Sequence, residues 1–520
     1  MAVHDHDPPS DDDDEGKKPK RQKRVGSNPL ADARRNSQQQ SRAENLWHRK
    51  SGAGFQLFVQ YYAHQPIGCV VSESSALTQP PPTKPTQLVG AGLSRAAKKR
   101  KKKKASTNTD EGPREEEEIN VETTGGYDVS DSKLLKAWIC SAQLTKSQPG
   151  YLHLKPYLEA LSKPLPLTFR LREGNPLEAT KTIQDDLQAK HGQLVKPYAF
   201  GNIFQSKSCH LSKASLTKQS PSLKAFLVQH SADGTLARQE FGSMLPVLGL
   251  ELTKRSRVLD VCASPGSKVL QALEVVGGKG RVVANDVHPT RLETLKDAVS
   301  RAGLSPVLTN RVIYTNFDAG VFPTPKNNRL FDAVVCDVPC SGDGTIRKDK
   351  HVLPLWTPAT GNSLHALQVR ILMRALQLVR VGGMVSYSTC SLNPIEDEAV
   401  VASVVSRMNA IKKKSEGGPA LELVDFPKLP GFVSRPGIKD WRVADYVGDT
   451  QNDQDDDSVS LRWHATYKEA MDANMDKAVS SMWPPSKEDA GLLHLERCIR
   501  LWPHDQDTGG FFVALIRKNH

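Results

Sequence analysis

Two cysteines and one aspartate lie in polar segments that directly follow two apolar stretches, and these three side chains could carry out nucleophilic chemistry. Asp337 and Cys340 follow the apolar run 333–336, and Cys390 follows a second apolar stretch further along the chain. A short apolar run that ends in small and polar residues is typical of a strand buried in a parallel sheet. Because open α/β sheets bind ligands at the carboxyl ends of their strands, we expect the acid and both thiols to line one site.

These thiols suit addition to a pyrimidine better than proteolysis, because no histidine lies in a motif near either one. A thiolate that adds to carbon 6 of cytosine turns the weakly nucleophilic carbon 5 into an enamine carbon, which can attack an activated methyl group. The acid assists by protonating or hydrogen-bonding ring nitrogen 3, and a base must remove the carbon 5 proton before the thiolate leaves. The alternative is that the cysteines are buried core residues, which suits Cys262 and Cys336 better than Cys340 and Cys390.

An adenosine-containing cofactor is expected beside the thiols. The strand expected at 257–261 leads into a loop of small residues and then a helix, so a ligand could approach backbone amides and the positive end of the helix. The loop is neither a Walker A motif nor Gly-x-Gly-x-x-Gly. Asp286 could bind ribose hydroxyls, and Asp318 could recognise the adenine amine, with a structural Asx turn as its alternative role. The expected cofactor loop comprises Cys262, Ala263, Ser264, Pro265, Gly266, Ser267 and Lys268.

Strand and helix patterns alternate from residue 257 onward, which predicts right-handed βαβ units and a parallel sheet of the α/β class. An outer strand is expected at 421–426 and a last strand at 509–516. The other expected strands are 257–261, 280–285, 311–315, 331–336 and 383–387, and the expected helices are 268–276, 289–302, 363–379 and 394–408.

The first half of the chain changes composition several times. Residues 1–43 combine charged runs with a Gln/Ser-rich stretch and are expected to be disordered, as is the low-complexity insert 72–130. Residues 44–71 place aromatic side chains at helical spacing, which predicts an amphipathic helix whose aromatic residues pack rather than form a binding stripe. We expect an accessory α+β region at 131–245, with helices at 134–144, 154–161 and 233–248, and a catalytic domain at 246–520.

The charge balance favours an anionic partner, and nucleic acid fits best. The chain has 520 residues, a formal charge of +12 and a pI near 9.2. The basic runs 17–24 and 98–104 favour nuclear localisation, the nucleolus included; a solvated charge run or a non-specific phosphate contact is the alternative. Eight scattered cysteines without zinc spacing predict neither a metal site nor a disulfide scaffold. With no secretory signal and no 18-residue apolar run, we expect a soluble, reduced, intracellular protein without a membrane partner.

Three motifs together resemble the Nol/Nop/Sun family of RNA cytosine-5 methyltransferases. They are Cys-Ala-Ser-Pro-Gly-Ser-Lys at 262–268, Asp-Val-Pro-Cys-Ser-Gly-Asp-Gly at 337–344 and Ser-Thr-Cys-Ser-Leu-Asn-Pro at 388–394. The resemblance covers roughly 130–520 and is greatest to the eukaryotic tRNA-modifying branch. It includes the segments 238–240, 342–348 and 497–512.

This resemblance implies a class I, Rossmann-like methyltransferase fold with a mostly parallel seven-stranded sheet, preceded by a small α+β RNA-binding region. It implies S-adenosyl-L-methionine as cofactor, bound by the 262–268 loop and the acids described above. Cys390 would be the nucleophile on carbon 6, and Cys340 would help to release the methylated RNA. Asp337 would contact the target base and lie beside the cofactor, with Lys268 near both. Ser264 replaces the alanine that the family usually carries at this position.

We expect tRNA as the substrate, with the same chemistry on ribosomal or messenger RNA as an alternative. A non-catalytic RNA-binding assembly factor is a different alternative, but it would not need Asp337, Cys340 and Cys390 together. A small-molecule or protein methyltransferase would leave the paired cysteines idle. The target cytosine must leave its stack to reach such a site. The flanking phosphates could be held by Arg347, Lys348 and Lys350, or these three could simply be a solvated loop. The sequence does not predict the oligomeric state.

Overall fold

A computed structural model describes residues 53–66, 151–208, 211–213, 215–412, 419–448 and 460–520. The disorder expected at 1–43 and 72–130, the helix expected at 134–144 and both basic runs therefore lie outside the described residues. Within the described ranges, no helix is long and apolar enough to span a bilayer.

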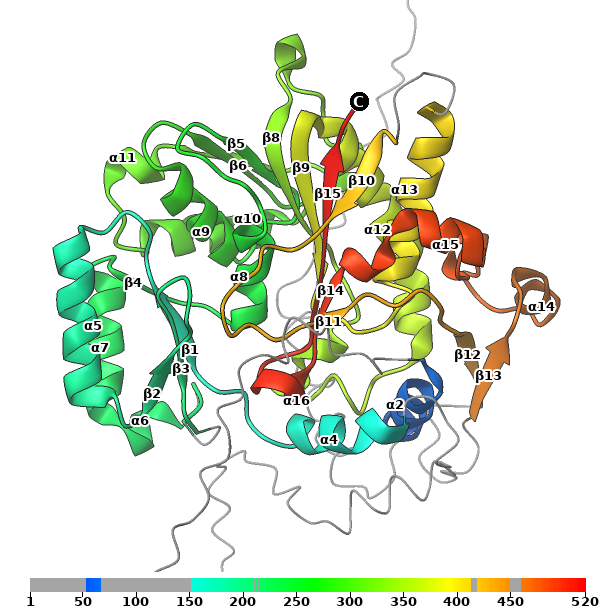
Figure 1. Cartoon of the computed structure of the whole chain (residues 1–520), viewed down its shortest axis with the longest axis horizontal. Helices are drawn as coiled ribbons and strands as arrows, with labels where there is room; N and C mark the ends of the chain where they lie inside the picture. Colours follow the sequence, from blue (N-terminus) through cyan, green and yellow to red (C-terminus); the bar gives the residue numbers. More distant parts are fainter. Residues whose placement is uncertain (1–52, 67–150, 209–210, 214, 413–418, 449–459) are drawn as a thin grey trace, which may run out of the picture.

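A nine-stranded sheet forms the centre of the molecule (Figure 1), with strand order β11-β14-β15-β9-β8-β5-β6-β7 and β10 paired to β15. The strands from β9 to β7 in this order are parallel, whereas β15 runs antiparallel to β9. The predicted α/β class is confirmed, but the described residues contribute nine strands where seven were expected. The bounds are β5 (Arg257–Asp260), β6 (Arg281–Asn285), β7 (Val312–Thr315), β8 (Phe331–Asp337), β9 (Val379–Thr389), β10 (Leu421–Val424), β11 (Arg435–Pro436), β14 (Ile499–Leu501) and β15 (Phe511–Lys518).

The order of the parallel strands reverses at β5, which pairs with β6 on one side and β8 on the other. Such a switch point opens a crevice at the carboxyl ends of the strands, where open α/β sheets bind their ligands. β5 ends at Asp260 and β8 ends at Asp337. The switch point therefore brings two carboxyl side chains to the same edge of the sheet.

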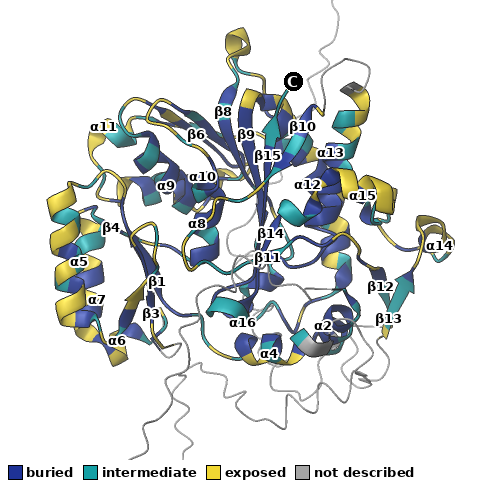
Figure 2. Ribbon diagram, viewed as in Figure 1, coloured by how far each residue is buried: buried dark blue, intermediate teal, exposed yellow. Residues whose placement is uncertain are grey.

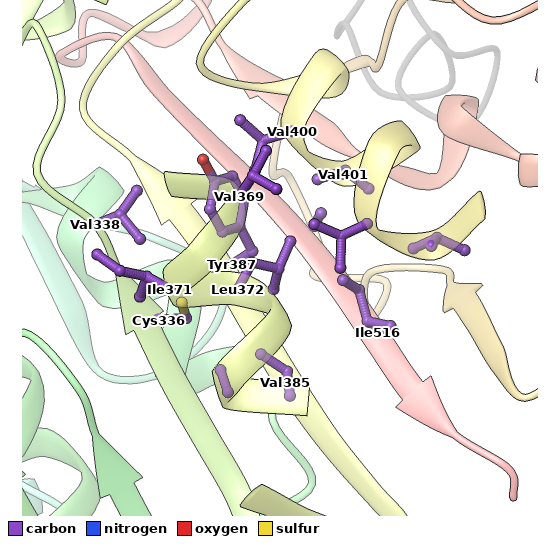
Figure 3. Close-up of a cluster of buried hydrophobic side chains, with 14 of the residues drawn as sticks. Cys336, Val338, Val369, Ile371, Leu372, Val385, Tyr387, Val400, Val401 and Ile516 are labelled. Carbon is purple, nitrogen blue, oxygen red and sulfur yellow. The ribbon is translucent and has the colours of Figure 1, made fainter. Parts of the chain in front are cut away.

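Helices cover both faces of the sheet (Figure 1). On one face lie α8 (Phe241–Leu248), α9 (Ser267–Val276) and α10 (Pro289–Ser300). On the other lie α12 (Pro358–Leu378) and α13 (Glu398–Lys412). Figure 3 shows this second core, where Cys336 and Tyr387 from the sheet pack among side chains of α12 and α13. Cys336 is fully buried, as expected, whereas Cys262 is only partly buried at the margin of the core.

The accessory region is an antiparallel sheet of order β2-β3-β1-β4 with helices on one side (Figure 1). α5 and α7 bury one side and expose the other (Figure 2), and the buried residues are Ile183, Leu187 and His191 in α5 and Leu223, Phe226 and Leu227 in α7. The bounds are β1 (Thr168–Leu171), α5 (Leu177–His191), β2 (Val195–Pro197), β3 (Ile203–Ser206), α6 (Leu216–Gln219), α7 (Pro221–Ala232) and β4 (Leu236–Arg238).

Some predicted boundaries were wrong. The helix expected at 233–248 begins only at Phe241, because Leu236–Arg238 forms β4 and pairs with β1. The helix expected from Pro394 begins at Glu398, since the Asn393 side chain accepts from the Ile395 amide and holds a turn there. The described residues also contain α4 (Tyr151–Leu161), close to the helix expected at 154–161.

The aromatic helix of the first half is α2 (Ala53–His64), and it packs beside α4 (Figure 1). Phe58, Tyr61 and Tyr62 are buried and contact Trp356. The packing interpretation of this helix is therefore confirmed. The remaining short elements are α11 (Pro306–Thr309), η2 (Ala319–Val321), η3 (Lys326–Asn328), η4 (Asp343–Thr345), β12 (Val443–Val447), β13 (Ser460–His464), α14 (Tyr467–Asp472), η6 (Ser480–Met482), α15 (Lys487–Leu493), η7 (Leu495–Arg497) and α16 (Pro503–Gln506).

Candidate active site

Asp337 is fixed at the end of β8 by one partner from helix α9 and one from the neighbouring strand β9. The Lys268 ammonium, in the first turn of α9 after β5, donates to Asp337 Oδ2 at 2.7 Å. Ser388 Oγ, on β9, donates to Oδ1 at 2.7 Å. Lys268 Nζ also donates to Ser243 Oγ at 3.0 Å. The carboxylate is thus held through both oxygens while its side chain remains 28% exposed, so a ligand can reach it.

Opposing charges set the protonation of this corner of the site. Burial lowers the pKa of Lys268, but the Asp337 and Asp260 carboxylates more than offset it, so the pKa is raised overall. Burial raises the pKa of Asp260 to about 7, against the opposing charge of Lys268. Lys268 is therefore a permanent cation beside Asp337, and Asp260 is a carboxyl group that titrates near neutral pH.

The structure brings the two predicted thiols into contact. Cys340 Sγ and Cys390 Sγ lie 3.3 Å apart, and both side chains are partly exposed. Their contact raises the pKa of Cys340, with burial as the next cause. Either sulfur can be the hydrogen-bond donor in this contact.

Glu396 ties the two cysteine loops together. Its Oε1 accepts from the Ser341 amide at 2.7 Å and from Gln368 Nε2 at 3.1 Å. Its Oε2 accepts from Ser391 Oγ at 2.9 Å and from the Ser341 hydroxyl. Ser341 follows Cys340 and Ser391 follows Cys390, so one buried carboxyl group positions both thiols; burial raises its pKa to about 7.

Glu396 was missed from the sequence. The available signal was its place three residues after Asn393 at the start of a helix, since an acid at this spacing commonly bonds the backbone of a helix N-terminus. In the structure its carboxyl instead reaches back to the cysteine loops.

Asp343, in the Cys340 loop, forms a second link to the Cys390 loop and also bonds to helix α2. Asp343 Oδ1 accepts from the Leu392 amide at 2.8 Å, and Oδ2 accepts from the Tyr62 hydroxyl. Burial raises the pKa of Asp343. The adjacent Gly344 donates its amide to the Cys390 carbonyl at 2.9 Å. A Cβ at Gly344 would lie 2.8 Å from that carbonyl oxygen, so only glycine permits this approach.

A buried ionic cluster supports the turn after Cys390. Arg500 donates to Glu398 Oε1 at 2.7 Å and to the Leu392 carbonyl at 2.8 Å, and it lies 3.3 Å from Asp397. Thr389 Oγ1, one residue before the cysteine, donates to Asp397 Oδ1 at 2.6 Å. These contacts fix the backbone on both sides of Cys390.

The predicted cofactor loop and Asp286 lie together. Asp286 is buried after β6 and accepts from the Ser264 amide at 3.3 Å and from the His288 amide at 3.0 Å. The Ser264 hydroxyl donates to the Arg291 carbonyl at 2.9 Å, which accommodates serine where alanine was expected. The loop closes through Gly266 at a φ of 110°, a conformation that favours glycine.

Asp318 forms the Asx turn that was its alternative role, because its Oδ1 accepts from the Gly320 amide at 2.8 Å. Its Oδ2 accepts from Arg370 at 3.1 Å, and the side chain is still 43% exposed. Two apolar side chains beside the predicted acids are also exposed, Val287 at 52% and Phe317 at 45%. Exposed apolar side chains that follow or precede the predicted acids in the chain are the kind of surface that can bind an adenine ring, and neither Val287 nor Phe317 was among the predicted site residues.

Arg347 was predicted to hold phosphate, and the structure contradicts this. Its guanidinium is buried and donates to the Lys163, Pro164 and Thr508 carbonyls at 2.9–3.0 Å and to Asp507 at 2.5 Å. Lys348 differs, because its side chain is 66% exposed with its ammonium 3.7 Å from Glu240. Lys350 is partly buried, and burial lowers its pKa. The Cys340 loop therefore offers Lys348 to a polyanion, whereas Arg347 stabilises the fold.

Comparisons with known proteins agree with this geometry. Residues 247–421 match the family model of 16S rRNA methyltransferase RsmB/F. A multisite-specific tRNA:(cytosine-C(5))-methyltransferase of Schizosaccharomyces pombe is 34% identical over 75% of this chain and 60% of its own length. A tRNA (cytosine(34)-C(5))-methyltransferase of Drosophila melanogaster is 36% identical over 59% of this chain, and a multisite-specific tRNA:(cytosine-C(5))-methyltransferase of Saccharomyces cerevisiae is 37% identical over 56%.

The chain covers 60% of the length of the first of these relatives and 40% of the other two. The matched region contains the predicted cofactor loop, both cysteines and Asp337. The three motifs on which the resemblance rested thus fall within the matched residues, and the family model and these relatives support the resemblance to the Nol/Nop/Sun family.

Proposed function

We propose that this protein is an S-adenosyl-L-methionine-dependent RNA cytosine-5 methyltransferase that acts on tRNA. The observation that supports this proposal best is the 3.3 Å contact between Cys340 and Cys390 beside the Asp337–Lys268 pair. Covalent catalysis at carbon 6 of a pyrimidine uses a thiol nucleophile and an acid, and a second thiol can assist its release, whereas a scaffold protein needs none of these groups. The names of the tRNA-modifying relatives favour tRNA as the substrate.

In the proposed reaction, the Cys390 thiolate adds to carbon 6 of a cytosine whose ring lies against Asp337. The new S–C bond shifts the ring electrons toward nitrogen 3, which takes up a proton delivered by the Asp337 carboxyl group, and carbon 5 becomes nucleophilic. Asp337 takes this proton back when the double bond re-forms. Lys268 and Ser388 hold that carboxylate in place. After carbon 5 is methylated its proton passes to a base, the double bond re-forms and the Cys390 thiolate leaves. Cys340 donates a hydrogen bond to the departing sulfur.

S-adenosyl-L-methionine would supply the methyl group. The residues present fit it: the 262–268 loop would lie along it, with Asp286 toward the ribose and Asp318 toward the adenine amine. Val287 and Phe317 would lose their exposed apolar surface to the adenine ring. Asp286 accepts from the Ser264 and His288 amides and pairs with Arg291 Nε at 3.3 Å, which leaves it about one more acceptor position for a ribose hydroxyl, because a carboxylate accepts up to about four hydrogen bonds.

The test is transfer of labelled methyl from S-adenosyl-L-methionine to total RNA from cells that lack the gene, followed by size fractionation and nucleoside analysis. We expect label as 5-methylcytidine in the tRNA fraction. Label found only in ribosomal or messenger RNA would show that this RNA, and not tRNA, is the substrate. Absence of label from every fraction would reject the enzyme proposal in favour of an RNA-binding assembly factor.

Nuclear localisation is part of the proposal and rests on the basic runs 17–24 and 98–104. Deleting both runs from the tagged protein should abolish its nuclear accumulation. Unchanged accumulation after the deletion would reject this role for the runs.

A further inference from the structure

A cavity of about 320 Å³ lies between the antiparallel sheet of the accessory region, β2-β3-β1-β4, and helices α9 and α10. Four arginines line it: Arg170 and Arg172 from the β1 segment, Arg238 at the end of β4, and Arg301 after α10. We propose that this cavity binds one backbone phosphate of the substrate RNA. The inference rests on the proposed function, because it assigns a contact for the same RNA.

The charges around the cavity leave it positive. Glu274 is buried beneath it and accepts from Arg170 at 2.5 Å and from Arg172 at 3.1 Å, so two guanidinium groups share one carboxylate. Arg238 and Arg301 add two further charges at the rim, where both residues are exposed. Arg301 Nε donates to the backbone carbonyl of Asp297, which leaves the charge of the guanidinium uncompensated at that contact. Guanidinium groups present paired N–H donors whose geometry matches phosphate oxygens.

A neutral donor also faces this space. Ser231 lines the cavity, and its hydroxyl oxygen is buried with no hydrogen-bond partner among the described residues. Buried hydroxyl groups are nearly always paired, so an unpaired one at a cavity wall indicates a missing partner. A phosphate oxygen would be an acceptor for this hydroxyl.

The cavity and the candidate active site share two chain segments. Ser267 lines the cavity, and the next residue, Lys268, contacts Asp337. Gln239 lines the cavity, and the next residue, Glu240, pairs with Lys348 of the Cys340 loop. On this proposal, an RNA strand that places a cytosine against Asp337 runs past the cavity with a neighbouring nucleotide. A phosphodiester next to the target base is the group that reaches the arginines.

The experiment uses the full chain and an unmodified tRNA transcript, with Arg238→Ala and Arg301→Ala as test variants. Both side chains are exposed, so neither change removes a buried partner. The control is Arg255→Ala, an equal charge change at an exposed residue before β5, at the opposite edge of the sheet. The tRNA dissociation constant is measured across a salt series, and the S-adenosyl-L-methionine dissociation constant is measured in parallel.

Each test variant should raise the tRNA dissociation constant about five- to tenfold and reduce the slope of log K against log salt by about 0.7–0.9. Cofactor affinity should not change. Phosphate ethylation of the tRNA should reveal a backbone position that weakens binding to the wild type and has no effect on Arg238→Ala. A dissociation constant and slope equal to those of Arg255→Ala would overturn the inference.

A free anion is the other possible source of the phosphate. If inorganic phosphate raises the Tm of the wild type but not of Arg238→Ala while tRNA affinity is the same in both, the cavity binds a free anion and the RNA assignment is rejected. Failure of the proposed function can be told apart from failure of this inference. If the wild type methylates no RNA, the proposed enzyme activity is rejected. Methylation by the wild type with unaltered binding by the test variants rejects the cavity alone.

Discussion

The Sγ atoms of Cys340 and Cys390 lie 3.3 Å apart, although fifty positions separate the two residues in the chain. The contact arises because β8 and β9 are parallel neighbours whose carboxyl ends meet at one edge of the sheet. Glu396 then holds the residue that follows each cysteine. The two thiols therefore act as one unit, and changes to the groups that hold their loops should alter the reaction without touching either sulfur.

Replacing Glu396 by glutamine should change the pH dependence of stability. The pKa of Glu396 is about 7 in the folded protein, above its ordinary value of 4.5, so the folded state retains a proton that the unfolded state releases. The stabilisation that this retained proton gives the folded state is complete below pH 4.5 and is lost as the pH rises through 7. Relative to Glu396→Gln, the wild type should lose up to about 1.4 kcal/mol of unfolding free energy per pH unit between about pH 5 and pH 7. Urea denaturation at several pH values measures this, and a pH-independent difference would contradict it.

Gly344→Ala should greatly slow the proposed methyl transfer. The added Cβ would lie 2.3 Å from the Gly510 carbonyl oxygen and 2.8 Å from that of Cys390, so the backbone must shift beside the proposed nucleophile. A displacement of this kind costs on the order of a hundredfold in rate. Gly491→Ala is the control, since its Cβ meets no atom within 4 Å and helix α15 should gain about 0.5–1 kcal/mol. Initial methyl-transfer rates and Tm values check both, and equal rates would contradict the account.

Arg347→Ala should lower stability rather than RNA affinity alone. Removal of the buried guanidinium leaves three carbonyls without their donor, at a cost of about 1–3 kcal/mol for the buried Thr508 carbonyl alone; Asp507 is 43% exposed and can be solvated. Lys348→Ala removes an exposed charge and should change unfolding free energy by less than about 0.5 kcal/mol while weakening RNA binding. Urea denaturation separates the two variants. Wild-type stability for Arg347→Ala would restore the phosphate-binding interpretation.

Tyr62→Phe should destabilise the protein by about 1–3 kcal/mol, because it leaves a buried oxygen of Asp343 without its donor. A double-mutant cycle with Asp343→Asn isolates the pairwise interaction. We expect a coupling energy above about 1 kcal/mol between the two substitutions. If the stability losses of Tyr62→Phe and Asp343→Asn add within about 0.5 kcal/mol, α2 does not act through Asp343. Tyr61→Phe, which loses its bond to Asn393 instead, should add to Asp343→Asn without this coupling.

The parallel strands could be predicted because a strand buried on both faces is a continuous apolar run, and the chemistry-bearing residues follow these runs directly. Strand β4 could not be predicted, because Leu236 continues the helical spacing of 236–245. The strand that pairs with β4 is β1, which lies far earlier in the chain. Local periodicity carries no information about such a partner.

The errors at side chains have the same origin. Arg347 lies in a basic stretch after Cys340, where an exposed side chain is expected. Nothing near it in the sequence shows that its guanidinium donates to the carbonyls of Lys163, Pro164 and Thr508. Glu396 gave only a helix-start signal, while its role depends on Ser341 from another strand end. The motif residues themselves were predictable, whereas the groups that orient them depend on contacts between distant segments.

The most direct test of the central claim is covalent trapping of RNA by wild type, Cys390→Ala and Cys340→Ala, each incubated with unmodified tRNA and S-adenosyl-L-methionine and resolved on a denaturing gel. Cys390→Ala should form no adduct and transfer no methyl group. Cys340→Ala should accumulate a protein–RNA adduct that carries the transferred methyl group, because release of the Cys390 sulfur is impaired. An adduct formed by Cys390→Ala, or full turnover by Cys340→Ala without accumulation, would contradict this division of roles.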